Sequence, residues 1–452
     1  MNLKPVIAIF DVGKTNKKLF LFDEQYKLVY EKSARFTEIF DEDGEICENL
    51  ESLRRSVYDS LRELINLNKF DVRAVNFATY GASFVYINAK GKPLTPLYNY
   101  LKVYPEKLHQ SFYEKYDGEE AFSLTTASPI LGSLNSGLQL YRLKYEQPEI
   151  YAQTKFALHL PQYISYLFTH QAYADKTSIG CHTSLWDFEK QAYHYWVKEE
   201  NLTAKLAPII SSEEVITTRF NGVTFKVGTG LHDSSAALIP YLISFNEPFV
   251  LLSTGTWCIS FNPFNHLPLT IEELKADCLN YLQYKGMPVK ASRLFAGYEH
   301  EQQVKRISLH FSHDSLKFRT MEFDPQVVRQ LEIEVDQSVN FGERDLSVFS
   351  NGQMAYHQLM IDIIKQQKVA TKLVLDGTNV NRIFVDGGFS KNSIFMHLLA
   401  AAFPGLEVFA ASMAQATAVG TALAIHQSWN SKPFPNDLIE LKYYSVKGSP
   451  NV

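Results

Sequence analysis

The chain is 452 residues long, carries a formal net charge of −5, and has 46% hydrophobic and 21% charged residues. This length exceeds one ordinary hydrophobic core and predicts about two or three domains of a globular protein. No window approaches the roughly 18 uninterrupted apolar residues of a membrane span, and no basic run is long enough for a nucleic-acid surface. Four widely separated cysteines without a C-x-x-C pair argue against a metal cluster or a disulfide framework. They favour a reducing cytoplasm.

Short apolar strands alternate with turns through the first part of the chain. Residues 6–10 (VIAIF) form an apolar run of strand length, DVGKTN supplies a turn, and KLFLF resumes a strand before KLVYE. A period near 3.6 through residues 50–67 (LESLRRSVYDSLRELINL) predicts an amphipathic helix. Residues 72–79 (VRAVNFAT) are the next predicted strand, and residues 83–94 are predicted as a strand followed by a turn.

The chain opens with a strand, a glycine turn and a second strand, and the same order occurs again in the second half. Residues 248–261 read PFVLLSTGTWCISF, and RIFVDGG at 382–388 precedes a predicted helix at 390–403. Alternating strands and helices predict an α/β fold with mixed sheets flanked by helices. Because one such unit opens each half, we expect two related domains, residues 1–243 and 244–452, that face a cleft.

The DVGKTN turn contains G-K-T, the end of a P-loop, but the rest of that motif is missing. A P-loop needs a glycine five positions before the G-K pair, where this chain has Ala8, and a helix after it, where KLFLF predicts a strand. A turn between antiparallel strands instead exposes backbone N–H groups that a phosphate can approach. The alternative is an ordinary hairpin turn. The phosphate ligands predicted here are Gly13, Lys14, Thr15, Asn16 and Lys18.

Three further segments are candidates for phosphate, nucleotide or metal binding. Asp11 ends the buried strand, where a carboxylate could hold Mg²⁺ directly or through water. The double glycine at 387–388 precedes a helix and offers N–H donors to a nucleotide. Its alternative is a plain strand-to-helix turn capped by Ser390 or Asn392. The matching turn of the second half predicts a second phosphate clamp from Thr254, Gly255 and Thr256.

The stretch 227–240, VGTGLHDSSAALIP, leaves two interpretations of Asp233 open. Asp-Ser-Ser ahead of an apolar run is typical of a helix start, where side chains accept hydrogen bonds from free N–H groups. A carboxylate between a glycine loop and a buried helix could equally be a general base. The two roles are compatible, since the positive field of the first helical turn favours an ionised carboxylate.

Together these segments resemble the FGGY carbohydrate kinases of the actin/sugar kinase/Hsp70-like superfamily, in order and over nearly the whole chain. Residues 11–18 (DVGKTNKK) and 252–257 (LSTGTW) resemble the two phosphate motifs of that family, and LHDS at 231–234 resembles its catalytic motif. Gly387 and Gly388 with Asn392 resemble its adenosine loop. The resemblance implies two actin-like (ribonuclease H-like) domains with the active site between them, and ATP and Mg²⁺ as cofactors. It also implies that Asp233 accepts the proton of the hydroxyl that is phosphorylated.

Weaker likenesses concern the substrate side. TYGASFVYI resembles a strand with a sugar-contacting glycine, here Gly81, and GYEHEQQV resembles the segment whose glutamine, here Gln302, meets the nucleotide. The pattern departs at Ser83, where an aspartate is usual, at residues 97–102, which lack an Arg-Asp or Asn-Asp pair, and at Gln415, which replaces a glutamate. The resemblance implies phosphorylation of a primary hydroxyl of a ketose, L-rhamnulose first, with L-fuculose or a ketopentose such as xylulose as alternatives. The sugar contacts predicted here are Gly81, Ser83, Tyr98, Asn99, His232 and Asp233.

Two other functional classes share parts of this pattern. Sugar-responsive regulators with a related Asp-x-Gly-x-Thr loop carry a basic helix-turn-helix ahead of it, whereas ten residues precede Asp11 here. A non-catalytic ATP-binding protein of the same superfamily is disfavoured by the presence of Asp233. The expected partners are a small ketose and ATP, without nucleic acid or membrane, for a cytoplasmic monomer or homodimer.

Overall fold

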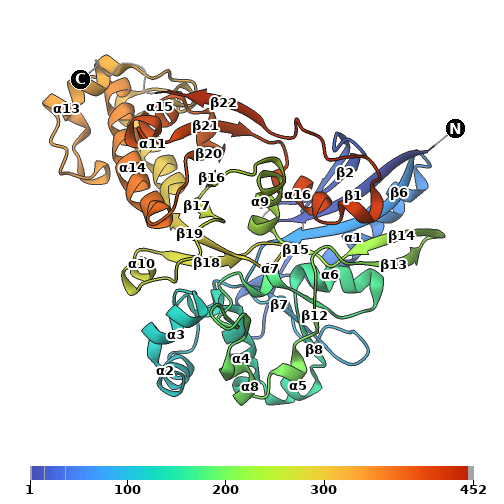
Figure 1. Ribbon diagram of the computed structural model, residues 1–452. Helices are drawn as coiled ribbons and strands as arrows, with labels where there is room; N and C mark the ends of the chain where they lie inside the picture. The colour runs from blue at the N-terminus through green and yellow to red at the C-terminus, as the bar shows by residue number, and fades with distance from the viewer. Residues whose placement is uncertain (1–2, 15, 36, 446–452) are drawn as a thin grey trace.

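The computed structural model describes residues 3–14, 16–35 and 37–445, and two seven-stranded mixed sheets form its frame (Figure 1). The first sheet runs in the order β13, β14, β6, β1, β2, β3, and β15 also pairs with β6. Its strands are β1 (Lys4–Val12), β2 (Lys17–Asp23), β3 (Leu28–Ala34), β6 (Phe70–Thr79), β13 (Val215–Phe220), β14 (Val223–Gly228) and β15 (Leu231–His232).

The second sheet runs in the order β18, β19, β17, β16, β20, β21, β22. Its strands are β16 (Phe249–Thr254), β17 (Cys258–Asn262), β18 (Cys278–Leu282), β19 (Pro288–Leu294), β20 (Arg382–Gly387), β21 (Glu407–Ser412) and β22 (Glu440–Tyr444). In each sheet the first strand, β1 or β16, pairs antiparallel with the next strand and parallel with a later one, β6 or β20. This shared topology confirms the predicted two-domain α/β fold. The exact boundary at 243/244 stays a prediction.

Helices cover both faces of the first sheet because the side chains of its strands alternate between the faces. From β1, Val6, Ala8 and Phe10 pack with α1 and α6, whereas Ile7 and Ile9 pack with α9 and α16. The bounds of these helices are α1 (Leu50–Asn66), α6 (Leu160–Thr169), α9 (Asp233–Ser244) and α16 (Ala416–Ala424). The short α17 (His426–Trp429) follows α16.

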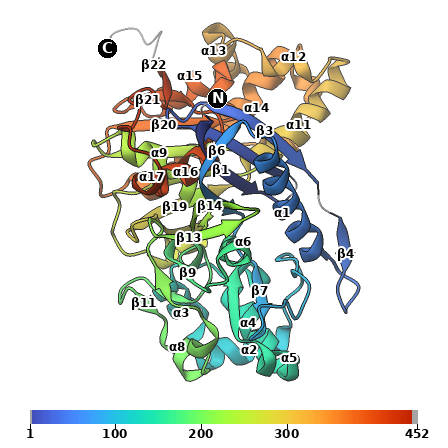
Figure 2. The same cartoon turned by 90° about the vertical axis from the view of Figure 1, so that its right-hand side faces the viewer.

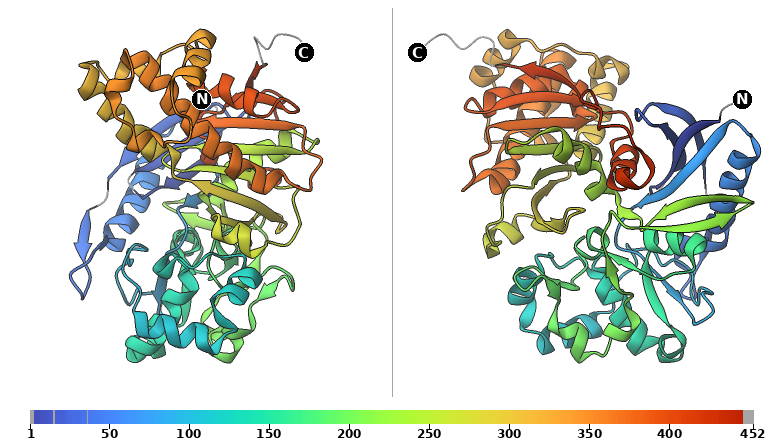
Figure 3. Two further views of the ribbon diagram at one scale, coloured as in Figure 1. Left: turned by 90° about the vertical axis from the view of Figure 1, so that its left-hand side faces the viewer. Right: turned by 45° about the vertical axis from the view of Figure 1, so that its right-hand side comes forward.

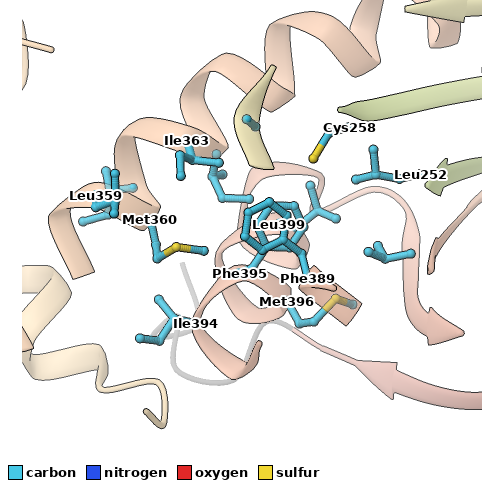
Figure 4. Packing of buried hydrophobic residues seen from close by; sticks show 14 of the residues in the cluster. Leu252, Cys258, Leu359, Met360, Ile363, Phe389, Ile394, Phe395, Met396 and Leu399 are labelled. Atoms are coloured by element: carbon cyan, nitrogen blue, oxygen red, sulfur yellow. The ribbon is translucent and has the colours of Figure 1, made fainter. Parts of the chain in front are cut away.

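Helices of the second half cover one face of the second sheet. Figure 4 shows Phe389, Phe395 and Leu399 at the centre of this packing, with Leu252 and Cys258 on the sheet side. The Phe389 and Phe395 rings stack with centroids 4.5 Å apart. The helices packed on this face are α10 (Ile271–Lys275), α11 (Ala296–Phe311), α12 (Leu316–Arg319), α13 (Pro325–Glu334), α14 (Gly352–Leu375) and α15 (Ser393–Ala402).

Helices α9 and α16 cross between the two sheets, as the right-hand view of Figure 3 shows for α16. Helix α9 contacts the first sheet through Ala236 and Ile239 and the second sheet through Leu238 and Tyr241. The crossing is close enough that a Cβ added at Gly420 would lie 1.9 Å from the Ala236 carbonyl oxygen. A glycine is therefore required at this point of the interface.

Residues 84–210 form most of a separate lobe below the first sheet (Figures 1 and 2). Its core holds Phe84, Phe112 and Trp196, together with Leu282 from the second sheet. The lobe contains β7 (Phe84–Ile87), β8 (Phe156–His159), β9 (Ala174–Asp175), β10 (Trp186–Asp187), β11 (Ala192–Tyr193), β12 (Ile209–Ile210), α2 (Glu106–Lys115), α3 (Gly118–Thr126), α4 (Ser136–Glu146), α5 (Pro148–Gln153), α7 (Lys176–Ile179) and α8 (Tyr195–Glu199). The small hairpin of β4 (Glu38–Phe40) and β5 (Ile46–Glu48) projects beside α1 (Figure 2).

The four cysteines lie apart in this fold, and each is buried with a free thiol. Burial raises the pKa of every one of these thiols: Cys47, Cys181, Cys258 and Cys278. Within the described ranges, none of the helices is long and apolar enough to cross a membrane.

Candidate active site

Parallel pairing brings three predicted site segments to one edge of the first sheet. In the register of β1, β6 and β15, Asp11 and Leu231 both lie beside Ala78. The chain leaves β6 towards Gly81 at this edge, and it leaves β15 into Asp233 at the start of α9. Asp11, Gly81 and Asp233 are thus collected at the carboxyl ends of adjacent parallel strands, where ligands bind in open α/β sheets.

Asp233 is the first residue of α9, and the residue in the N-cap position is His232. The Asp233 carboxylate accepts a 2.6 Å hydrogen bond from the Ser234 N–H and lies 3.2 Å from His232 Nε2. The interpretation of Asp233 as the cap is therefore wrong by one position. Burial raises the pKa of Asp233 to about 6 and outweighs the lowering hydrogen bonds from Ser234. The helix start does not keep this carboxyl at a low pKa as expected, because desolvation dominates.

Asp11 is a second half-buried carboxylate close to Asp233. Its pKa is raised to about 7, first by burial and then by the negative charge of Asp233, against the lowering effect of Lys18. Lys18 itself forms a 3.0 Å ion pair with Glu31. Two carboxylates whose negative charges are only partly compensated form a donor set that suits a hard divalent cation such as Mg²⁺. The residues present at this edge therefore fit the predicted metal.

The first glycine turn closes between β1 and β2, where the Gly13 N–H donates to the Asn16 carbonyl at 3.0 Å. Lys14, on this turn, lies over the rings of Tyr80 and Tyr100 at 5.5 and 5.0 Å and 3.5 Å from Glu48. Thr15, also predicted as a phosphate ligand, lies outside the described residues.

The Glu48 carboxylate contacts several side chains around the first glycine turn. It is buried, accepts a 2.8 Å hydrogen bond from the Tyr80 hydroxyl and forms a 3.0 Å ion pair with buried Lys17. Burial raises the pKa of Tyr100, and the negative charges of Asp233 and Glu48 raise it further. Glu48 and its neighbours thus connect the first turn to the surroundings of Asp233.

The second glycine turn meets the double glycine of the second sheet because β16 and β20 are parallel and in register, with Thr254 beside Gly387. The Gly388 N–H donates to the Thr254 carbonyl at 2.8 Å, and the Phe389 N–H donates to the Thr254 hydroxyl at 3.0 Å. A Cβ at Gly387 would lie 2.0 Å from the Thr254 carbonyl oxygen, and the residue has a φ of 92°. Only glycine permits this approach.

The start of α11 packs equally closely on Gly255, and a Cβ at Gly297 would lie 1.8 Å from the Gly255 carbonyl oxygen. The Tyr298 N–H donates to the Thr256 carbonyl at 3.1 Å. Thr254, Gly255 and Thr256 are therefore held by backbone contacts from two sides.

The remaining predicted nucleotide ligands have different surroundings. Asn392 is the buried N-cap of α15, where its oxygen accepts from the Phe395 N–H and its nitrogen donates to the Tyr356 hydroxyl at 2.7 Å. Gln302 is half-buried on α11 and lines a shallow groove with Lys305. The structure supplies a structural role for Asn392, and nucleotide contact stays a prediction for both residues.

His232 stands beside Asp233 in a fully packed environment. Its Nε2 lies 3.1 Å from Cys181 Sγ, and burial lowers its pKa to about 3, so the imidazole is neutral. A Cβ at Gly81 would lie 2.8 Å from Cys181 Sγ and 3.3 Å from His232 Nε2. Gly81 and His232 are thus close neighbours, and their contact with a sugar stays a prediction.

Tyr98 and Asn99 are not brought to this cluster. The Tyr98 hydroxyl donates to Glu42 at 2.6 Å, and the Asn99 side chain donates to the Ile46 carbonyl at 3.2 Å. Both line a different, small cavity beside α4. The neighbouring Tyr100 is instead close enough to Asp233 that the negative charge of Asp233, after burial, raises its pKa. Ser83 is buried, and its hydroxyl has no hydrogen-bond partner among the described residues.

Comparisons with known proteins identify the family of this chain. Residues 6–239 match the N-terminal domain of the FGGY family of carbohydrate kinases, and residues 246–433 match the carbohydrate kinase FGGY C-terminal domain. The chain belongs to the FGGY family of carbohydrate kinases. Carbohydrate kinases of this family are phosphotransferases that use ATP.

Individual relatives of this FGGY chain are distant. A rhamnulokinase from Halalkalibacterium halodurans is 23% identical over 61% of this chain, and the aligned part spans 60% of that protein. A carbohydrate kinase from Novosphingobium aromaticivorans has a similar structure, with a TM-score of 0.81, 22% identity and coverage of 98% of this chain and 95% of the other. A ligand-bound xylulose kinase from Lactobacillus acidophilus gives a TM-score of 0.78 at 15% identity, with 98% and 94% coverage.

Several residues of the FGGY site were not found from the sequence. Glu48, Tyr100 and Cys181 come from a short hairpin, an irregular segment and the end of a short helix, none of which carries a chemical motif. Tyr281, whose ring stacks on His232 with centroids 5.7 Å apart, comes from the second sheet. A tyrosine or an isolated cysteine gives no sequence signal, so only the pairing of distant segments reveals these contacts.

Proposed function

We propose that this chain transfers the γ-phosphoryl group of ATP to a primary hydroxyl of a ketose, with L-rhamnulose as the first candidate. The observation that carries the proposal is the half-buried Asp233 carboxylate, which lies with Asp11 where the first sheet ends. A base with a pKa of about 6 is mostly ionised at neutral pH and still basic enough to accept a proton in the transition state.

In this mechanism the ketose hydroxyl donates its proton to the Asp233 carboxylate as its oxygen attacks the γ-phosphorus. Phosphoryl transfer needs positioning and charge stabilisation more than covalent help. Backbone N–H groups of the two glycine turns and the ammonium groups of Lys14 and Lys18 would bind the phosphates. Asp11 would hold Mg²⁺, which supplies further neutralisation of phosphate charge when bound.

The choice of ketose rests on weaker support. The rhamnulokinase relative favours L-rhamnulose, and the xylulose kinase of similar structure keeps a ketopentose as an alternative, with L-fuculose as a third candidate. The absence of an aspartate at Ser83 leaves the order among these sugars to experiment.

A coupled ADP-release assay across a panel of ketoses tests the proposal. We expect sugar-dependent ADP release with at least one of L-rhamnulose, L-fuculose, xylulose and ribulose. Background ATP hydrolysis with every sugar would refute the kinase proposal and favour a protein that binds ATP without catalysis.

The variant Asp233→Asn tests the role of the carboxylate. We expect a near-normal melting temperature and at least a roughly 100-fold loss of phosphorylation, within the range for a general base. Asp187→Asn is the matched control, because Asp187 is a buried carboxylate of the lobe core. Retention of most activity in Asp233→Asn would remove Asp233 from the mechanism.

A further inference from the structure

The hairpin of β18 and β19, at the edge of the second sheet, reaches into the first half of the molecule (Figure 1). The Asn280 N–H donates to the Ala127 carbonyl at 3.2 Å, and the Leu282 carbonyl accepts from the Ser235 hydroxyl at 3.0 Å. Leu282 packs so closely on α7 that a Cβ at Gly180 would lie 2.4 Å from its Cγ. The end of β18 is therefore firmly seated beside the start of α9.

Tyr281 projects from this seated strand onto His232. The two rings are nearly parallel, at 8°, with centroids 5.7 Å apart, and both residues are buried. Phe261 and His182 contact the Tyr281 ring edge-on at 5.6 and 6.2 Å. The second sheet thus fixes one face of the imidazole that lies 3.2 Å from the Asp233 carboxylate.

The guanidinium of Arg293, on this hairpin, is already paired with a carboxylate. Arg293 on β19 donates two hydrogen bonds to Asp277, at 3.1 and 2.6 Å, and its guanidinium lies 5.4 Å from the centre of the Trp257 ring. A bidentate carboxylate pair occupies the guanidinium edge that would otherwise bind an anionic ligand. His182 is also buried. Burial, followed by the positive charge of Arg293, lowers its pKa to about 3, so its imidazole is neutral.

We propose that the β18–β19 hairpin forms one wall of the sugar pocket, with Tyr281 positioning His232 by ring stacking and the Asp277–Arg293 pair selecting an uncharged sugar. The inference rests on the proposed kinase function and refines its substrate class. A neutral ketose meets a neutral imidazole on this wall, whereas a sugar acid would meet an Arg293 guanidinium that Asp277 already binds.

Steady-state kinetics of Tyr281 variants test the positioning role. We expect Tyr281→Leu to raise the KM for the ketose at least tenfold while the KM for ATP changes less than twofold. Tyr281→Phe retains the stacked ring and should stay within threefold of wild type for both substrates. Tyr113→Leu is the control, because Tyr113 is equally buried but lies in the lobe core. A folded Tyr281→Leu protein with an unchanged ketose KM would refute this role.

The variant Asp277→Asn tests the selection against charge and does not depend on how Tyr281→Leu folds. Releasing Arg293 from its carboxylate should strengthen competitive inhibition by a six-carbon aldonate at least tenfold. Unchanged inhibition would refute the charge argument. If wild-type protein phosphorylates a ketose and these variants behave like wild type, the inference fails while the kinase proposal stands. If wild-type protein phosphorylates no sugar, the kinase proposal itself fails.

Discussion

The raised pKa of Asp11 makes a testable link between metal binding and stability. The Asp11 pKa is about 7 in the folded protein against a reference value of 3.8, so the folded state binds this proton more tightly than the unfolded state. The resulting stabilisation is fully present below the unfolded pKa and is lost as the pH rises through about 7. At pH 8 the folded protein therefore holds an ionised carboxylate at an energetic cost that Asp11→Asn removes.

The magnitude follows from the distance between pH and pKa. At pH 5.5 the pH lies about 1.5 units below the pKa of Asp11 in the folded protein. Each of these units changes the free energy of unfolding by about 1.4 kcal/mol. The stability of wild type relative to Asp11→Asn should therefore rise by about 2 kcal/mol over this interval. Buried histidines such as His232, with their lowered pKa, destabilise both proteins equally in acid and cancel in the difference.

Urea unfolding of both proteins at the two pH values, with a chelator present, measures this difference. Asp59→Asn is the control, because Asp59 is exposed and paired with Arg62 on α1, and its difference from wild type should not depend on pH. Added Mg²⁺ at pH 8 should stabilise wild type but not Asp11→Asn. An equal difference between wild type and Asp11→Asn at both pH values would refute the reasoning about the Asp11 environment.

Three more predictions concern the surrounding structure. Glu48→Gln removes the carboxylate charge that pairs with buried Lys17 and should lower the free energy of unfolding by about 1.5–3 kcal/mol, as measured in urea. Gly420→Ala forces α9 and α16 apart, since its Cβ would lie 1.9 Å from the Ala236 oxygen, and should cost about 1–3 kcal/mol in the same assay. For the wild type, kcat/KM should fall about tenfold per pH unit below about 6 as Asp233 is protonated. A flat kcat/KM between pH 5 and 7 would contradict the assignment of Asp233 as the base.

Matched controls separate these effects from general damage. Glu31→Gln breaks the partly exposed pair with Lys18 and should cost less than about 1 kcal/mol. Gly405 has open space where a Cβ would be added, so Gly405→Ala should leave stability nearly unchanged. Equal losses in test and control variants would show that burial and close packing do not govern these sites.

The strands and turns were predictable because their signals are local. The apolar runs beginning at Val6 and Phe249 are strands in the structure, and a glycine turn follows each of them. The helix at α1 follows its 3.6-residue period. The meeting of Asp11 with Asp233 depends on the parallel pairing of β1, β6 and β15, and no local pattern encodes that order.

The misplaced and missed residues have physical reasons as well. Tyr98 was favoured over Tyr100, but residues 97–102 form no strand or helix, so no period shows which tyrosine lies near Asp233. The Asp233 pKa was expected to follow the helix field, yet desolvation decides it. Tyr281 lies 49 positions after His232 in a different sheet, and only tertiary packing brings their rings together.

The burial of all four native thiols has a practical consequence for measuring motion. Reagents that label surface cysteines should not reach the buried native thiols. The raised pKa of each thiol also keeps it protonated and unreactive at Cys47, Cys181, Cys258 and Cys278. One cysteine introduced on each half would therefore carry spectroscopic labels without prior removal of the native ones. Distances between two such labels, followed as nucleotide and sugar are added, would report directly how far the two halves approach during turnover.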